Sequence, residues 1–321
     1  MLNKIIRRCS RYYWELIKRQ KAFDRRKLSI EDYLDEIKSE KIKNEMPRLL
    51  VSIDDLSMTR NSLLSYDRGG DEGGILEQIV STIEIYDWLR PIFFIIPKNR
   101  EVLDGRNIFC SPFDISSLKH PRNYERVLTI KELRKKGYFD IGMHGLYHKQ
   151  FDRIGYHPYA EFEFSDNLSD HAKLKHMVDV FDLLDLQTPL FKPPAFGVGC
   201  AISKEIVKTL SDINGITHAF LSTPNNGLNT HSFNVSHINE TKLHKITNVP
   251  QNINLLWSEG EIVQVVQNII EKNGIVHPQC HCVEPGCLED GWSDFIVSRL
   301  KLIESIMSAS TRGYKIWKPS T

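Results

Sequence analysis

The sequence predicts an α/β fold built on a mainly parallel sheet. After Pro47, short apolar runs rich in β-branched and aromatic residues alternate with stretches of helical pattern, and such alternation is typical of βα units. The hydrophobic content of 41% over 321 residues is enough to form a large core. The spacing suits a barrel of βα units, and we find neither an internal repeat nor a low-complexity linker.

The individual elements follow from the period of the apolar residues. Runs of β-rich residues predict strands at 49–53, 92–96, 140–143, 190–192, 218–222 and 274–277. Apolar residues that recur every three or four positions predict helices at about 74–88, 129–136, 170–184, 203–211, 259–272 and 293–308.

An N-terminal helical extension over residues 1–47 is expected to precede a catalytic domain over 48–321. Residues 1–28 carry ten Lys or Arg and two acidic residues, a net charge of +8. Their apolar side chains recur at helical spacing, so this segment is either a helix or arm docked on its own domain, or a helix that rests on an anionic membrane surface. A second, polar helix is expected over 29–45, with Ser29 as its N-cap.

The bulk composition limits the partners and the location. The net charge of +1 gives no electrostatic argument for nucleic acid. No window reaches the roughly 18 uninterrupted apolar residues of a membrane-spanning helix. The first twenty residues have scattered charges and no apolar signal region, so we expect a cytoplasmic protein, at most attached to the inner face of the membrane, with its six cysteines reduced.

Four stretches with reactive side chains follow predicted strands. In βα folds the functional groups gather at the carboxyl ends of the strands, so these stretches are expected to meet at one rim. They are SIDD (52–55), DIGMHGLYHK (140–149), LFKPPAFG (190–197) and GIVHPQCHC (274–282).

A divalent-metal site is the most specific interpretation of these stretches. His144 and His148 are four residues apart, so in a helical turn both imidazoles share one face, and Gly145 allows a tight turn after the strand. A carboxylate from Asp54 or Asp55 would complete a ligand set and leave the other acid as a general base. The alternative is a chance pair of histidines together with two acids that only cap a turn.

The pattern resembles the polysaccharide deacetylases with a NodB-type domain, carbohydrate esterase family 4 and its relatives. The matches lie in the family's order between residues 48 and 285. They are Ser-Ile-Asp-Asp (52–55) for T-F-D-D, RPIFFIIP (90–97) for the Phe-rich strand, DIGMHG (140–145) for E-I-G-x-H-[GST], His144 to His148 for H-[ST]-x-x-H, residues 192–197 for R-P-P-[YF]-G, and Ile275-Val276-His277 for L-x-H.

The resemblance implies a distorted (β/α) barrel of about seven strands and a role for each matching residue. Asp54 would be the catalytic base. The metal ligands would be Asp55, His144 and His148, holding Zn²⁺ or else Co²⁺, Ni²⁺ or Mn²⁺. The backbone N–H near Ala195 would stabilise the oxyanion, Lys192 would orient Asp54, and His277 would be the general acid, with His281 as the alternative. Pro194, Phe196 and Trp257 are the expected substrate contacts.

Two departures from the family motifs bear on activity. Lys192 stands where the family has Arg, and a Lys ammonium lacks the planar fork with which Arg grips a carboxylate. Gly145 replaces the Ser or Thr of the second motif. These departures keep open a non-catalytic relative that only binds glycans.

The expected reaction is hydrolysis of an acetyl group, either an N-acetyl amide or an O-acetyl ester, on a sugar. The substrate is expected to be an acetylated sugar, a sugar nucleotide or a lipid-linked glycan in surface polysaccharide biosynthesis. The alternative within the same fold is a metal-dependent amidase that cleaves a non-sugar C–N bond.

Overall fold

The computed structural model describes residues 39–57, 75–96, 101–103, 106–108, 121–145, 149–152, 155–160, 169–194, 204–221, 238–281 and 294–319. Its helices are α3 (Ile75–Ile85), α5 (Pro121–Lys135), α6 (Asp170–Leu183), α7 (Lys204–Asp212), α8 (Glu259–Glu271) and α9 (Asp294–Ser308). Within the described residues, no helix is long and apolar enough to cross a membrane.

The strands form one large sheet and three small ones. The large sheet contains β2 (Ser52–Ser57), β3 (Ile92–Ile96), β6 (Asp140–Met143), β9 (Leu190–Phe191), β10 (His218–Ala219), β11 (Thr241–Leu243), β12 (Ile246–Asn248), β13 (Ile253–Asn254) and β15 (Pro278–His281). The small sheets are β1 (Arg48–Leu49), β14 (Ile275–Val276) and β16 (Lys315–Ile316), then the pair β4 (Glu101–Leu103) and β5 (Arg106–Ile108), then the pair β7 (Lys149–Asp152) and β8 (Gly155–Ala160).

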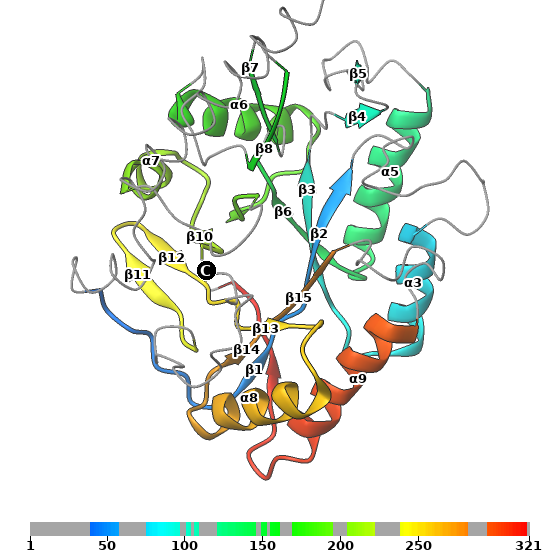
Figure 1. Ribbon diagram of the computed structural model, residues 1–321, viewed down its shortest axis with the longest axis vertical. Coiled ribbons are helices and arrows are strands. Elements are labelled where there is room, and N and C mark those ends of the chain that lie inside the picture. Colours follow the sequence, from blue (N-terminus) through cyan, green and yellow to red (C-terminus); the bar gives the residue numbers. More distant parts are fainter. Residues whose placement is uncertain are drawn as a thin grey trace, which may run out of the picture.

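The predicted α/β class and curled parallel sheet are confirmed. The order of the large sheet is β11-β12-β10-β9-β6-β3-β2-β15-β13, and every neighbouring pair is parallel except β11 with β12. The helices lie around the outside of this curled sheet (Figure 1). Among the described residues eight mutually parallel strands line the curl, close to the seven or so that were expected.

Two separate hydrophobic cores lie on the two faces of the curled sheet. The larger core contains Val51 and Ile53 together with apolar residues from all six described helices, so it fills the space between the sheet and the helices. The smaller core contains no helical residue and therefore lies inside the curl; its members are Leu50, Ile92, Phe94, Leu190, Phe220, Val249, Ile275 and Trp317. Because side chains alternate along a strand, residues 50, 52 and 54 share the inner face.

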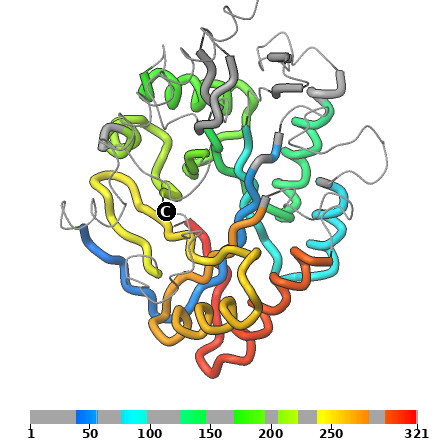
Figure 2. The backbone as a smooth tube through the Cα atoms, viewed as in Figure 1, coloured from blue at the N-terminus to red at the C-terminus, as the bar shows by residue number. Residues whose placement is uncertain are grey.

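The C-terminal strand closes the amino end of this interior. After α9 the chain returns to the middle of the fold (Figure 2), where β16 pairs in parallel with β1. Trp317 then packs edge-to-face against Phe220, with ring centroids 6.0 Å apart, and its Nε1–H donates to Oε1 of Glu240 over 2.9 Å. Arg48 pairs with the same carboxylate at 3.3 Å.

Most predicted elements lie within a few residues of their observed bounds, and two expectations need correction. The helix predicted from 129 begins at Pro121, a residue that is favoured at the first helical position because it lacks an N–H. The helix expected over 29–45 is not helical in its described part: Lys41 forms a bridge with Thr241, and the backbone N–H of Ile42 donates to the carbonyl of Glu240. This segment covers the edge of β11.

Candidate active site

The inner face of the curled sheet changes from apolar to polar toward the carboxyl ends of the strands. Alternation along the strands places the polar side chains one above another with the inner core beneath them. They are Ser52 and Asp54 on β2, His144 after β6, Lys192 after β9, and His277 and Gln279 at the end of β14 and in β15. The polar side chains thus lie on β2 and β15 and directly after β6, β9 and β14.

A β-bulge in β2 accommodates the two adjacent acids. Ile53 pairs with Phe93 and Leu56 pairs with Ile95, so both Asp54 and Asp55 lie opposite the single residue Phe94. A bulge inserts one extra residue and changes the direction of the side chains beside it. The strand that was expected to end at Ile53 therefore continues past both acids to Ser57, and the backbone of Asp54 and Asp55 lies within β2 and not at its end.

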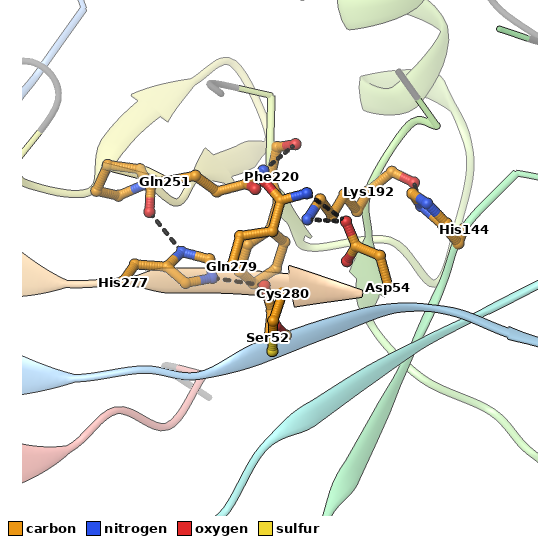
Figure 3. Close-up of polar contacts among 10 residues, drawn as sticks. Ser52, Asp54, His144, Lys192, Phe220, Gln251, His277, Gln279 and Cys280 are labelled. Atoms are coloured by element: carbon orange, nitrogen blue, oxygen red, sulfur yellow. Dashed lines mark hydrogen bonds and ion pairs between the residues drawn. The ribbon is translucent and has the colours of Figure 1, made fainter. Parts of the chain in front are cut away.

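Asp54 is held through one of its two carboxylate oxygens. Oδ2 forms an ion pair with Nζ of Lys192 and accepts a hydrogen bond from Nε2 of Gln279 over 2.7 Å (Figure 3). The Asp54 side chain is 1% exposed and that of Lys192 is 2% exposed, so the pair is shielded from water. Among the described residues the other oxygen, Oδ1, has no hydrogen-bond partner. The carboxylate thus has one anchored oxygen and one that remains for chemistry.

Lys192 reaches Asp54 across the interior of the curl. In the sheet order β9 and β2 are separated by β6 and β3, and Nζ of Lys192 lies 5.4 Å from the centroid of the Phe94 ring on β3. The ring face adds a cation–π attraction in a site shielded from water. A Cβ at Gly142 would collide with this ring, so glycine at that position of β6 is required by the packing.

His144 is oriented by the backbone of the neighbouring strand. Its Nδ1 lies 2.9 Å from the carbonyl oxygen of Lys192, and because a carbonyl only accepts, Nδ1 carries the proton and Nε2 carries the lone pair. This is the arrangement by which a metal-ligating histidine is held in its binding tautomer. Gly145, at φ 70°, makes the sharp exit from β6 that the sequence predicted.

His277 lies one layer deeper than Asp54 and is fully buried. Its Nδ1–H donates to the carbonyl of Pro250 over 2.7 Å, and its Nε2 accepts from the hydroxyl of Ser52 over 2.8 Å. Burial, together with the positive charge of Lys192, lowers the pKa of His277 to about 3. The imidazole is therefore neutral near pH 7, and a general-acid role would require a second proton at Nε2, where Ser52 donates.

The Ser52–His277 pair does not form a nucleophilic site. A serine bonded to a histidine whose other nitrogen is held is the arrangement of a hydrolase triad. However, the side chain of Ser52 is 0% exposed beneath Asp54, so no substrate can reach its Oγ. The pair links β2 to the turn before β15 instead.

Of the predicted site residues, the structure brings together Asp54, Lys192 and His144, with His277 one layer deeper. His148, Ala195 and Phe196 lie outside the described residues, as do the side chains of Asp55 and His281. In the backbone register, His281 pairs with Asp54 at the carboxyl end of β15.

The two remaining substrate contacts expected from the sequence differ in position. Pro194 is buried and lies two residues beyond Lys192 in the chain. Trp257 is only partly buried and packs against the larger core on the helical side of the sheet. The described contacts therefore associate Trp257 with the outer core, whereas Pro194 follows the strand that carries Lys192.

Sequence reasoning missed Gln279 and Ser52 as members of the site. Both belong to stretches that were singled out, and both share the inner face with a predicted residue, Gln279 with His277 and Ser52 with Asp54. Side chains two positions apart on a strand point to the same face, so counting two residues from His277 or from Asp54 would have identified them.

The described residues fit a metal site only in part. Within the ranges that the structure describes, no group of three or more His, Cys, Asp or Glu side chains could hold an ion. His144 nevertheless has the tautomer that a ligand requires, and the bulge places Asp55 beside Asp54 in β2. The donor types of Asp55, His144 and His148, one carboxylate and two imidazoles, suit Zn²⁺.

Comparison of the sequence with family models and with curated proteins found no match. The chain is similar to solved structures. A family 4 acetyl xylan esterase from Clostridium thermocellum, in complex with a cobalt ion, is 13% identical, with 84% of this chain and 86% of that chain covered at a TM-score of 0.38. The chitin deacetylase from the fungal pathogen Colletotrichum lindemuthianum is 12% identical, with 86% and 87% covered at 0.42.

A 4-alpha-glucanotransferase from Thermococcus litoralis is also similar to the chain. It is 12% identical at a TM-score of 0.46, and the match covers 85% of this chain but only 39% of the glucanotransferase. Because all three TM-scores lie below 0.5, the functional conclusion rests on the residues of the chain's own site.

Proposed function

We propose that the protein is a divalent-metal-dependent hydrolase that removes an acetyl group from a sugar. One observation carries this proposal: a buried carboxylate, Asp54 of β2, is anchored through Oδ2 by Lys192 and Gln279. Its second oxygen has no partner in the described part of the chain. A base held in this way at the carboxyl rim of a βα sheet is suited to take a proton from water.

The proposed ligands of the ion are Asp55, His144 and His148. His144 supports this assignment because the carbonyl of Lys192 holds its Nδ1–H and so directs the lone pair of Nε2 to the ligand role. Zn²⁺ is the favoured ion, with Co²⁺, Ni²⁺ or Mn²⁺ as alternatives. When bound, such an ion acidifies water and polarises a carbonyl.

Asp54 performs the first proton transfer in the proposed reaction. As the oxygen of water adds to the acetyl carbonyl carbon, Asp54 accepts the proton through Oδ1 and a tetrahedral oxyanion forms. The backbone N–H near Ala195 is the proposed donor to this oxyanion. The C–N bond then breaks, the amine leaves with a proton, and acetate remains; with an O-acetyl ester the leaving group is the sugar hydroxyl.

For the proton that the leaving group requires, we propose His281 instead of His277. His277 is neutral, fully buried, and bonded through both ring nitrogens to Pro250 and Ser52. His281 is the last residue of β15, four positions after His277, and its backbone pairs in register with Asp54.

The substrate proposal is an acetylated sugar in surface polysaccharide biosynthesis, either a sugar nucleotide or a lipid-linked glycan. For a lipid-linked substrate, the basic segment 1–28 would bring the enzyme to an anionic membrane surface. Flotation with phosphatidylserine-containing vesicles tests this contact by comparing the full chain with a chain that begins at Pro47. Equal flotation of the two would remove the membrane proposal and leave the deacetylase proposal intact.

Acetate release from a panel of acetylated sugar nucleotides and oligosaccharides tests the activity itself. The expected result is acetate release that stops when the metal is removed by a chelator and returns with Zn²⁺. Asp54→Asn should abolish it, and Asp182→Asn, an exposed change on α6, should not. Release of ammonia from non-sugar amides without acetate would support the amidase alternative. Glycan binding without acetate or ammonia release would support a non-catalytic relative.

A further inference from the structure

We propose that Gln279 is a positioning residue that, together with Lys192, fixes the direction of the Asp54 carboxylate. The proposal rests on the proposed function in one respect, namely that Asp54 acts as the base. It concerns a residue to which the sequence motifs assigned no role. The observation behind it is the convergence of the Lys192 ammonium and the Gln279 amide on one oxygen, Oδ2 of Asp54 (Figure 3).

Lys192 by itself holds the charge of Asp54 but not its orientation. An ammonium is a compact point charge on a flexible stem, with no planar arrangement of donors that matches a carboxylate. Lys192 also reaches Asp54 from β9, across the interior and past the Phe94 ring. With one contact to Oδ2, the carboxylate could still rotate about its Cβ–Cγ bond.

Gln279 supplies the second, directional contact from the opposite side. It lies on β15, directly beside β2, and its backbone pairs with Ser52, two residues before Asp54. Its amide therefore reaches along β2 to Oδ2, where Nε2 donates over 2.7 Å. An amide N–H is planar and directional and carries no net charge, so it orients the carboxylate without adding a second cation to the buried site.

The strand that carries Gln279 is itself anchored just before this residue. The backbone N–H of His277 donates to Oδ1 of Asn252 over 3.0 Å, and the His277 ring spans from Pro250 to Ser52. These contacts fix the position of Gln279 along β15 relative to Asp54. With Oδ2 occupied by two donors from different strands, the carboxylate plane is fixed and Oδ1 is presented in one direction.

The consequence is a selective effect on the chemical step. If Gln279 orients the base and does not bind substrate, its loss lowers kcat and leaves KM nearly unchanged. Gln279→Met keeps the length and shape of the side chain and removes the donor. Gln279→Glu keeps the shape but places a carboxylate oxygen against Oδ2, so it should be worse than Gln279→Met.

The experiment measures kcat and KM of the metal-loaded full chain on 4-nitrophenyl acetate. We expect Gln279→Met to lower kcat about 10- to 100-fold, as is typical for partners that orient a reacting group. Gln279→Glu should lower kcat further, and metal content should stay at the wild-type value in both variants. Gln264→Met, the same substitution at an exposed position of α8, is the matched control.

A second measurement does not depend on activity. The side-chain amide protons of Gln279, identified in ¹H–¹⁵N spectra as the pair lost in Gln279→Met, should shift toward the free-amide range in Asp54→Asn, because the acceptor loses its charge. No shift in Asp54→Asn, or wild-type kcat in Gln279→Met, would overturn the proposal. If instead Asp54→Asn keeps full activity, the proposed function fails while the amide shift still reports the contact.

Discussion

The hydroxyl of Ser52 donates a hydrogen bond to Nε2 of His277, with the two atoms 2.8 Å apart and both side chains fully buried. The other ring nitrogen donates to the carbonyl of Pro250, which fixes the tautomer. His277 therefore behaves as a neutral crosslink beneath the proposed base. Because His277 is buried and neutral, the free energy of unfolding should depend on pH.

We expect the protein to lose stability between pH 7 and pH 5 through His277. Burial, and then the charge of Lys192, lowers the pKa of its imidazole to about 3 in the folded state, whereas a histidine in the unfolded chain has a pKa of about 6.5. Below that value the unfolded state binds a proton that the folded state does not. The free energy of unfolding therefore falls with decreasing pH, by up to about 1.4 kcal/mol per pH unit.

Urea unfolding at pH 7, 6 and 5 measures this effect, because most carboxylates titrate below this range. Burial also lowers the pKa of His218, to about 4, so two histidines contribute. His277→Gln should be less stable at pH 7 but show a smaller loss toward pH 5, whereas His171→Gln, at an exposed position on α6, should keep the wild-type slope. An unchanged slope in His277→Gln would contradict this account of His277.

The two late histidines should differ in their effect on the reaction. His281→Gln is expected to lower kcat by about 10²- to 10⁴-fold, the usual contribution of a general acid, with little change in urea midpoint. His277→Gln is expected to act mainly on stability. Initial rates and urea midpoints of both variants decide the matter, and the opposite assignment, a large kcat loss confined to His277→Gln, would restore His277 as the acid.

The sequence predicted the parts of the site that follow from strand ends and residue chemistry. Asp54 lies within β2, and His144 and Lys192 directly follow β6 and β9; these are parallel strands of one sheet, whose carboxyl ends lie together. How a lysine at position 192 could still orient Asp54 could not be predicted. The second donor to Asp54 is Gln279, which is 87 residues after Lys192 in the chain and lies on β15, the neighbour of β2. Such a contact depends on register, which the sequence does not display.

Strands and helices could be predicted where apolar residues recur at a clear spacing. They could not be predicted where a short strand forms only because it pairs with a segment far away in the sequence. The strands at 92–96 and 140–143 were predicted within their observed bounds because they are buried on both faces. The short strands β11, β13 and β16 gave no such signal, since each has two or three residues and is defined by its partner. The helix expected over 29–45 failed at 39–45 because an edge strand offered backbone hydrogen bonds there.

Trp317 should be a main determinant of stability although it lies far along the chain from the site. It is 4% exposed within the inner core, and its indole N–H donates to Glu240. Trp317→Ala is expected to lower the free energy of unfolding by about 3–5 kcal/mol. Trp317→Phe keeps an aromatic ring and loses the hydrogen bond to a buried acid, so about 1–3 kcal/mol is expected.

Urea unfolding of both Trp317 variants at pH 7 provides the measurement. Ile85→Ala, which shortens an apolar side chain that is 70% exposed, is the control and should change stability by less than about 0.5 kcal/mol. A Trp317→Ala midpoint close to that of the control would show that the inner core does not depend on the C-terminal strand.

The ion pair between Asp54 and Lys192 should show strong coupling in a double-mutant cycle. Either Lys192→Met or Asp54→Asn leaves one buried charge without its partner, and each is expected to cost about 3–5 kcal/mol of stability. The double variant Asp54→Asn/Lys192→Met removes both charges and should lower the free energy of unfolding much less than the two single variants together.

The matched control is the Lys131–Asp185 pair, with atoms 2.8 Å apart but an Asp185 side chain that is 76% exposed. The same cycle there should give a much smaller coupling energy, because water screens the exposed pair. Equal coupling energies in the two cycles would mean that the Asp54–Lys192 pair is not shielded from water, and the anchored base would lose its physical support.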